Sequence, residues 1–374
     1  MAGLYIHIPF CKRRCHYCDF YSTTQEQLQD AYVAAVCQEM EERERELHEP
    51  IETLYIGGGT PSQLSPLLLT EIVRHASDVF GFKTLKEFTI EANPDDITPA
   101  WVMGIRQAVP EGRVRVSMGI QTFDDATLAL IGRRHNAAQA LAAVRTLRDA
   151  GIDEISIDLM YGLPGEDESR WASDLEQATS LGVPHISAYC LTYEEGTVLW
   201  KQREDGKVEE ADEELCERFY FMLRDRLKKA GYEHYELSNF AFPGHHALHN
   251  ASYWNGTPYL GIGPGAHSYD GSTRSWNAPD LKAYIANPLS GRSSEVLTDD
   301  EKYDEYVMTR LRTAIGIDPN ELERLFGTAR RDYCLAHAHS YLKSHRLRYT
   351  ADGHIVLGEE GLFVSDGIIA NLFS

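Results

Sequence analysis

The sequence has no long hydrophobic run and no excess of positive charge. Among its 374 residues, no apolar stretch comes near the roughly 18 residues that a membrane-spanning helix needs, so we expect no transmembrane segment. The formal net charge is −21, and such an acidic surface repels phosphate backbones, which argues against nucleic acid as a partner. The chain starts without an apolar targeting region, which predicts a cytoplasmic protein.

Cysteine is scarce and odd in number. Seven cysteines in this chain do not form an even disulfide framework, which is in keeping with a reducing compartment. Four of them are scattered through predicted helices and strands, and we expect these to be small buried hydrophobic residues: Cys37, Cys190, Cys216 and Cys334.

The other three cysteines lie together near the start of the chain. Cys11, Cys15 and Cys18 follow an apolar, strand-like stretch (4–9) with the spacing C-x3-C-x2-C. A [4Fe-4S] cluster normally takes four thiolates, so three ligands leave one iron open to a small molecule, as in a reactive site. The alternative is zinc, with His7 or His16 as fourth ligand, although zinc sites usually add a second, distant ligand pair.

The first half of the chain alternates strand-like and helix-like segments. Six such units with short connections predict a parallel sheet with right-handed crossovers, curled into a partial (β/α)6 barrel. Working residues of such folds gather at the carboxyl ends of the strands, where the cysteine loop lies. The predicted strands are 4–9, 53–58, 87–92, 115–120, 154–160 and 185–191, and the helices are 26–48, 66–79, 98–108, 124–131, 136–150 and 169–182.

The sequence predicts three regions. Residues 1–195 form the barrel, and residues 296–374 form a smaller α+β domain that is winged-helix-like. Between them, residues 196–295 form an extension with a long amphipathic helix and then a part rich in glycine, histidine and aromatics, with little periodicity. The expected elements of the last region are helices at 301–313, 319–325, 329–344 and 360–373, with a strand pair before the last.

Several residues at the strand ends carry polar chemistry. The run Gly57-Gly58-Gly59-Thr60-Pro61 follows the second strand, and glycines let the backbone approach a ligand closely. Asp158 lies inside an apolar strand, where an unpaired carboxylate is costly to bury, so it is either paired or directed at a ligand.

These pieces together resemble the radical S-adenosylmethionine superfamily, and within it the oxygen-independent coproporphyrinogen dehydrogenase family. The matching runs are LYIHIPFC, GGGTPS, EANP, GIQTF and DLMYGLPG. The resemblance implies a [4Fe-4S] cluster on the three cysteines, S-adenosylmethionine on the open iron, and an electron donor such as flavodoxin or ferredoxin. It implies S-adenosylmethionine contacts from Tyr5, Tyr17, Gly58, Gly59, Thr60, Glu91, Gln121, Arg133, Asp158 and Thr192.

Two departures separate the chain from the dehydrogenase branch. Phe20 occupies the position of a further cysteine in that branch, and only three residues precede the first strand, where that branch has an extension. Residues 249–254 instead spell HNxxYW, which resembles the signature of the heme chaperone branch, HemW. A neutral imidazole is a natural iron ligand, and tyrosine and tryptophan offer flat apolar surface to a porphyrin.

The resemblance therefore implies a heme chaperone that passes heme to an acceptor, such as a hemoprotein or a membrane-bound respiratory enzyme. The implied heme contacts are His249, Asn250, Tyr253 and Trp254, with His245, His246 and His267 as competing iron ligands. Two alternatives stay open: a radical-generating coproporphyrinogen III dehydrogenase, and a structural zinc protein with a degenerate barrel.

Overall fold

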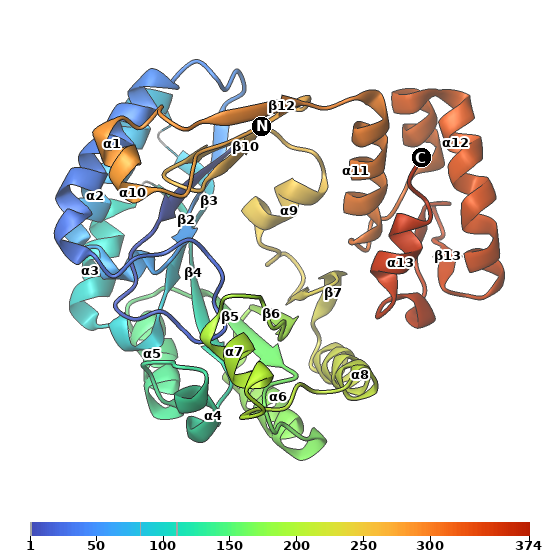
Figure 1. Cartoon of the computed structure of the whole chain (residues 1–374), viewed down its shortest axis with the longest axis horizontal. Helices are drawn as coiled ribbons and strands as arrows, with labels where there is room; N and C mark the ends of the chain where they lie inside the picture. The colour runs from blue at the N-terminus through green and yellow to red at the C-terminus, as the bar shows by residue number, and fades with distance from the viewer. Residues whose placement is uncertain (1, 83, 110) are drawn as a thin grey trace.

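The computed structural model describes residues 2–82, 84–109 and 111–374. Figure 1 shows two parts side by side, which we call the sheet unit (residues 2–296) and the C-terminal unit (299–374). Each has its own hydrophobic core. No helix of the described ranges is both long and apolar enough to cross a membrane.

Six parallel strands form the centre of the sheet unit, as predicted. In β1, alternate side chains (Leu4, Ile6 and Ile8) are completely buried against the helices, so the intervening residues face the inside of the curled sheet. The strands are β1 (Ala2–Ile8), β2 (Ile51–Gly58), β3 (Thr84–Ala92), β4 (Glu111–Gln121), β5 (Glu154–Tyr161) and β6 (His185–Cys190), hydrogen-bonded in that order.

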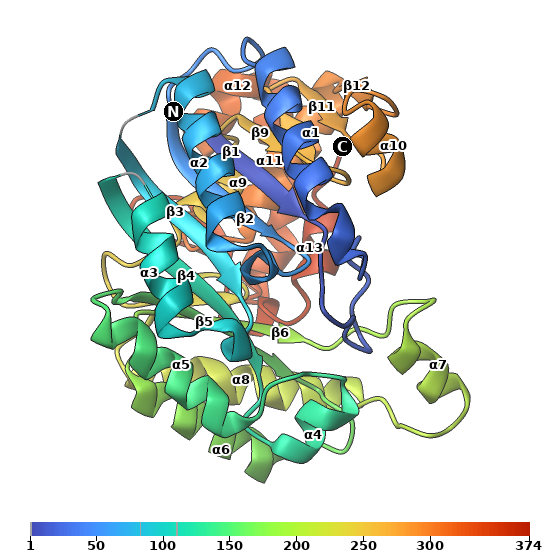
Figure 2. The ribbon, with the colours of Figure 1, turned by 90° about the vertical axis from the view of Figure 1, so that its left-hand side faces the viewer.

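Helices cover the outer face of these strands, as Figure 2 shows for α1 to α3. Side chains of Ser65, Thr98, Asn136 and Asp167 accept hydrogen bonds from backbone N–H groups at helix starts, which offsets the unpaired donors there. The helices are α1 (Gln29–Glu42), α2 (Pro66–Phe80), α3 (Pro99–Ala108), α4 (Asp125–Leu130), α5 (Ala137–Asp149) and α6 (Glu168–Leu181). The predicted helix 26–48 was too long, because the chain turns at Arg43 and α1 ends at Glu42.

The extension adds strands to both edges of the sheet. β8 (Asn239–Ala241) pairs with β6 and with β7 (Glu233–Glu236), and β9 (Tyr259–Ile262) runs parallel to β1. The strands β10 (His267–Tyr269), β11 (Thr273–Trp276) and β12 (Ser293–Val296) continue the sheet antiparallel, which gives twelve strands among the described residues. Helices α7 (Val198–Glu204), α8 (Glu213–Lys229), α9 (Leu248–Trp254) and α10 (Leu281–Ala286) complete the extension.

The C-terminal unit has the predicted helices and strand pair. α11 (Asp299–Leu311) precedes α12 (Pro319–Lys343), which is kinked at Gly327, as two predicted helices over this range require. The hairpin of β13 (Leu347–Tyr349) and β14 (Ile355–Leu357) leads to α13 (Ser365–Ala370). This last helix is shorter than predicted, because a 3-10 turn (Glu359–Gly361) occupies its start.

A buried ion pair fastens α1 to the extension. The Arg43 and Glu39 side chains, almost completely buried, approach to 2.6 Å. Arg43 also donates to the carbonyl oxygen of Gly261 at 2.7 Å and to Ser268 Oγ at 2.9 Å. Glu39 accepts from the Gly263 N–H at 2.9 Å. These bonds fix the loop between β9 and β10 against α1.

Candidate functional site

The three clustered cysteines line one cavity of about 440 Å³ at the carboxyl ends of the central strands, which we call the thiol cavity. Thr60 Oγ1 donates to Cys11 Sγ and Arg133 Nη1 donates to Cys15 Sγ, each at 3.4 Å. Burial, together with the nearby thiols of Cys15 and Cys11, raises the pKa of Cys18 to about 11. The raised pKa favours the protonated thiol, whereas a bound metal ion such as iron favours the thiolate form.

The two histidines considered as a fourth zinc ligand are engaged elsewhere. Nδ1 and Nε2 of His7 lie 3.0 Å from the Tyr5 hydroxyl and from the Tyr21 carbonyl oxygen, and His16 Nδ1 lies 2.7 Å from the Leu130 carbonyl oxygen. Within the described ranges, no three His, Cys, Asp or Glu side chains are placed to hold a single metal ion. Three thiols around one cavity fit a cluster, in which each thiolate binds its own iron.

Two half-buried carboxyl groups face the same cavity. Glu91 accepts hydrogen bonds from the Tyr55 hydroxyl at 2.7 Å and from the Gly58 N–H at 3.0 Å. Burial, and then the nearby Asp158, raises the pKa of Glu91 to about 7, against the hydrogen bonds that lower it. Burial also raises the pKa of Asp158 to about 6, although hydrogen bonds from Ser187 and Ser117 oppose the rise. Two such groups favour a cationic ligand.

Arg133 offers the opposite charge beside them. Its Nη2 donates to the carbonyl oxygen of Gly119 and to Asn93 Oδ1. Its Nε is buried and has no hydrogen-bond partner in the part of the chain that the structure describes. A buried donor without a partner is costly, so this atom is suited to a carboxylate ligand. Carboxylates and a guanidinium around one cavity fit the ammonium and carboxylate of an amino acid such as the methionyl part of S-adenosylmethionine.

The glycine run at the end of β2 (Gly57 to Gly59) is required by close packing. A Cβ on Gly57 would lie 2.9 Å from Glu91 Oε1, and one on Gly59 would lie 2.9 Å from the Ile8 carbonyl oxygen. Gly58 has a φ of +110°, which side chains disfavour. The run thus lets β2 end directly against the cysteine loop and leaves the Glu91 carboxylate room beside it.

The structure brings most of the predicted S-adenosylmethionine contacts together. The thiol cavity is lined by Tyr17, Gly58, Gly59, Thr60, Glu91, Gln121, Arg133, Asp158 and Thr192, and also by Asn250. Tyr5 was also predicted as a contact; it lines the larger cavity described below together with Gly58 and Glu91, and its contact with S-adenosylmethionine stays a prediction.

Sequence reasoning missed the polar neighbours that lower the pKa of the two carboxyl groups: Tyr55 beside Glu91, and Ser117 and Ser187 beside Asp158. Ser187 on β6 is in register with Asp158 on β5. The sequence signal that could have found these residues is a polar residue within an apolar strand, at a position whose side chain points to the inner face of the sheet.

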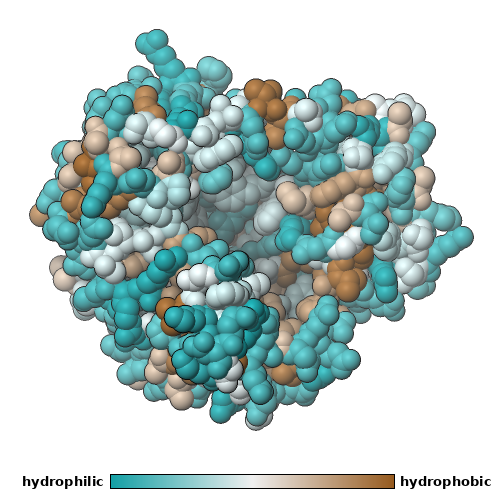
Figure 3. Space-filling model, in the orientation of Figure 1, coloured by the Kyte–Doolittle hydropathy of each residue, from teal (hydrophilic) through white to brown (hydrophobic). Residues whose placement is uncertain are grey.

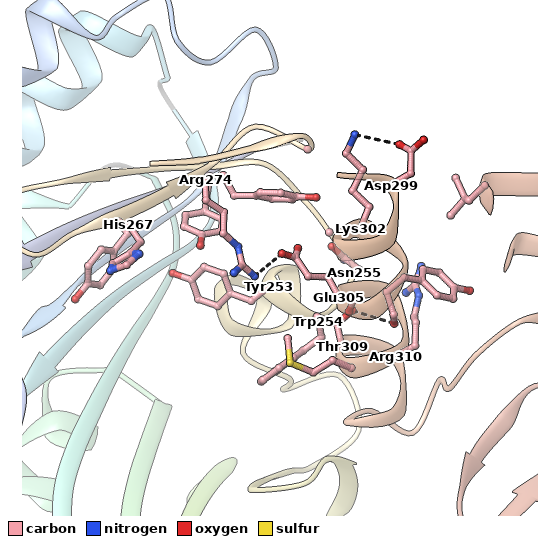
Figure 4. A pocket seen from close by; sticks show the side chains of 18 of the residues that line it. Tyr253, Trp254, Asn255, His267, Arg274, Asp299, Lys302, Glu305, Thr309 and Arg310 are labelled. Atoms are coloured by element: carbon pink, nitrogen blue, oxygen red, sulfur yellow. Dashed lines mark hydrogen bonds and ion pairs between the residues drawn. The ribbon is translucent and has the colours of Figure 1, made fainter. Parts of the chain in front are cut away.

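A larger cavity of about 1290 Å³ lies between the sheet unit and α11 and α12, which we call the aromatic cavity (Figure 4). Figure 3 shows the surface hollowed between the two units. Its lining includes the aromatic side chains of Tyr5, Tyr253, Trp254, Tyr259, Tyr269 and Tyr306. Phe20, Gly58 and Glu91 line both cavities, so the two adjoin there.

The HNxxYW motif, which lies entirely within α9, is divided between these spaces. Asn250 lines the thiol cavity, whereas Tyr253 and Trp254 line the aromatic cavity. His249 is completely buried and lines neither: its Nδ1 lies 2.9 Å from Thr53 Oγ1 and its Nε2 lies 2.9 Å from the Tyr253 hydroxyl. Burial lowers the pKa of His249 to about 3, so the ring is neutral. Iron ligation by His249 stays a prediction.

Comparison with known proteins agrees with this geometry. Residues 5–178 match the model of the radical SAM superfamily, the class of proteins that the barrel and its three-cysteine loop define. The chain is 36% identical to the heme chaperone HemW of Lactococcus lactis, over 86% of this chain and 84% of that protein. It is 35% identical to the heme chaperone HemW of Mycobacterium tuberculosis, over 99% of this chain and 94% of that protein.

The chain belongs to the HemW family of this superfamily. The solved structure of coproporphyrinogen III oxidase (HemN) from Escherichia coli superposes with a TM-score of 0.83 and covers 100% of this chain and 90% of that one. At 23% identity, this likeness shows a shared fold.

We expect Glu91 to make the protein without ligands less stable as the pH rises. Its folded pKa of about 7 lies above the ordinary 4.5, so the folded chain binds the proton more tightly than the unfolded chain. As the pH rises from the unfolded to the folded pKa of Glu91, the free energy of unfolding therefore falls by on the order of 3 kcal/mol. Glu91→Gln should remove most of this fall, measured as urea unfolding at pH 5.5 and pH 8.

The matched control is Glu176→Gln, on the exposed face of α6, which should keep the wild-type dependence. An unchanged dependence in Glu91→Gln would show that this carboxyl does not titrate as its burial requires.

Proposed function

We propose that this protein is a heme chaperone, which binds heme, a [4Fe-4S] cluster and S-adenosylmethionine and passes heme to an acceptor protein. The observation that carries the proposal is the similarity to proteins named heme chaperone HemW, which extends over nearly the full chain, HNxxYW motif and C-terminal unit included. A large aromatic cavity beside that motif supports it.

Cys11, Cys15 and Cys18 would hold the cluster, and Glu91, Asp158 and Arg133 would hold the methionyl part of S-adenosylmethionine. When bound and reduced, the cluster supplies the electron that cleaves the C–S bond of S-adenosylmethionine. An electron donor such as flavodoxin or ferredoxin is therefore a proposed partner. The acceptor is a hemoprotein, such as a membrane-bound respiratory enzyme. Seven free cysteines suit the reducing cytoplasm as the location.

One feature disfavours the alternative, a coproporphyrinogen III dehydrogenase. Phe20, in the place of that branch's further cysteine, is 65% exposed where the two cavities meet. A phenyl ring there supplies neither a metal ligand nor a proton to a substrate.

The test is an anaerobic reconstitution of the cluster, followed by separate additions of heme and of coproporphyrinogen III with S-adenosylmethionine and reductant. We expect uptake of about one heme per chain, followed by absorbance, and no decarboxylated product by chromatography. Conversion of coproporphyrinogen would overturn the proposal and make the protein an oxidative decarboxylase.

A further inference from the structure

We propose that heme binds in the aromatic cavity between the two units, with His267 rather than His249 as the ligand of its iron. This inference rests on the proposed function and deepens it, since it assigns the cargo a site and an iron ligand. Three features of the described residues support it: the size of the cavity, the state of its histidines, and the placement of its cations.

The two cavities differ in size by about threefold, at about 440 and 1290 Å³. The smaller is typical of a site for one small cofactor, and the larger exceeds the usual range for small-molecule sites. A porphyrin is wide and flat and needs aromatic walls. Tyr253 and Tyr259 supply such a wall, with ring centroids 4.7 Å apart in an edge-to-face arrangement.

Two histidines line the aromatic cavity, His7 and His267. Both ring nitrogens of His7 have hydrogen-bond partners, as described above. In the described part of the chain, no hydrogen bond involves the ring of His267, which lies nearly parallel to Trp276 with centroids 6.0 Å apart. An imidazole nitrogen without a hydrogen-bond partner is able to bind iron.

His267 is held in place by the sheet through its backbone. It starts β10, next to Ser268, whose hydroxyl accepts a hydrogen bond from the buried Arg43. His249, in contrast, would have to give up its bonds with Thr53 and Tyr253 and leave a fully buried position to reach either cavity. An iron ligand needs an accessible nitrogen, and the exposed ring of His267 provides one.

Cations on the opposite wall suit the heme propionates. Figure 4 shows Lys302, Glu305 and Thr309 on α11, across the cavity from His267. Arg274 is paired with Glu305 at 2.7 Å, whereas Lys302 lies 3.8 Å from Asp299, which is almost fully exposed. An exposed pair at that distance is weak, so Lys302 is the cation most easily recruited by a propionate. Heme bound in this way contacts both units.

The test compares heme binding by the reconstituted full-length protein and three single variants. Hemin is titrated into each, followed by the Soret band and by electron paramagnetic resonance, which reports the iron ligands. His267→Ala should weaken binding on the order of tenfold or more and change the iron spectrum. His249→Ala should retain a wild-type spectrum. The matched control is His339→Ala, an exposed residue of α12 that lines neither cavity.

A fourth variant tests the location without changing any histidine. Thr309→Trp, on the cavity side of α11, should fill the space and weaken hemin binding while the circular dichroism and the iron–sulfur absorbance stay unchanged. Wild-type binding and spectrum in His267→Ala, or wild-type binding in Thr309→Trp, would overturn this inference and leave the chaperone function intact. A wild-type protein that takes up no heme would instead overturn the proposed function.

Discussion

Replacing Cys15 with alanine is expected to abolish the iron–sulfur cluster while most heme binding remains. Two thiolates do not retain a cubane that normally takes four, so iron and acid-labile sulfide should each fall from about four per chain to near zero. Cys15 lines the thiol cavity and not the aromatic cavity, so the heme site keeps its walls. The measurements are metal and sulfide analysis after anaerobic reconstitution, and a hemin titration of the same sample.

The matched control is Cys37→Ala, a partly buried cysteine of α1 that lines neither cavity and should leave both readouts unchanged. A cluster that survives in Cys15→Ala would contradict the ligand assignment. Loss of heme binding in a folded Cys15→Ala protein would contradict the separation of the two sites.

The second large effect concerns stability. Arg43→Met is expected to lower the free energy of unfolding by about 3–5 kcal/mol, because it leaves the buried Glu39 carboxylate without its cation. The double variant Arg43→Met/Glu39→Gln should recover much of this loss, since no unpaired charge then stays buried. Urea unfolding of all three proteins at constant pH measures both values.

Arg218→Met is the control, because Arg218 pairs with Glu168 at 2.9 Å between two half-exposed side chains. Such a pair contributes about 0–1 kcal/mol. Equal losses in Arg43→Met and Arg218→Met would contradict the role of the buried pair.

Since Arg43 also binds Ser268, next to His267, its loss should weaken heme binding as well.

Much of the barrel could be predicted from local pattern. Six apolar runs separated by amphipathic segments indicate buried parallel strands and covering helices, and the structure confirms each of them. The cysteine loop and the glycine run after the second predicted strand were placed at one rim, because parallel strands that all end at one edge bring those ends together. The kink at Gly327 also agrees with the two helices predicted on either side of it.

The extension could not be predicted in this way. Strands β7 to β12 have three or four residues each, too few to show a period of two, and their partners are distant in sequence. β9, for example, pairs with β1 across about 250 residues. The sequence therefore does not show that β1 has a second neighbour, nor that Tyr5 on β1 lines the aromatic cavity.

The sequence by itself determined the family chemistry of this protein: three cysteines in one loop, a glycine run that admits close backbone approach, and charged residues at strand ends. These are local signals, which survive without knowledge of distant contacts. Only the tertiary structure decided how the HNxxYW motif is divided, burying His249 and turning Tyr253 and Trp254 towards α11. The physical reason is that residues far apart in the chain form the walls of the aromatic cavity. The size of the cavity, and the position of His267 on its wall, therefore depend on the packing of the two units.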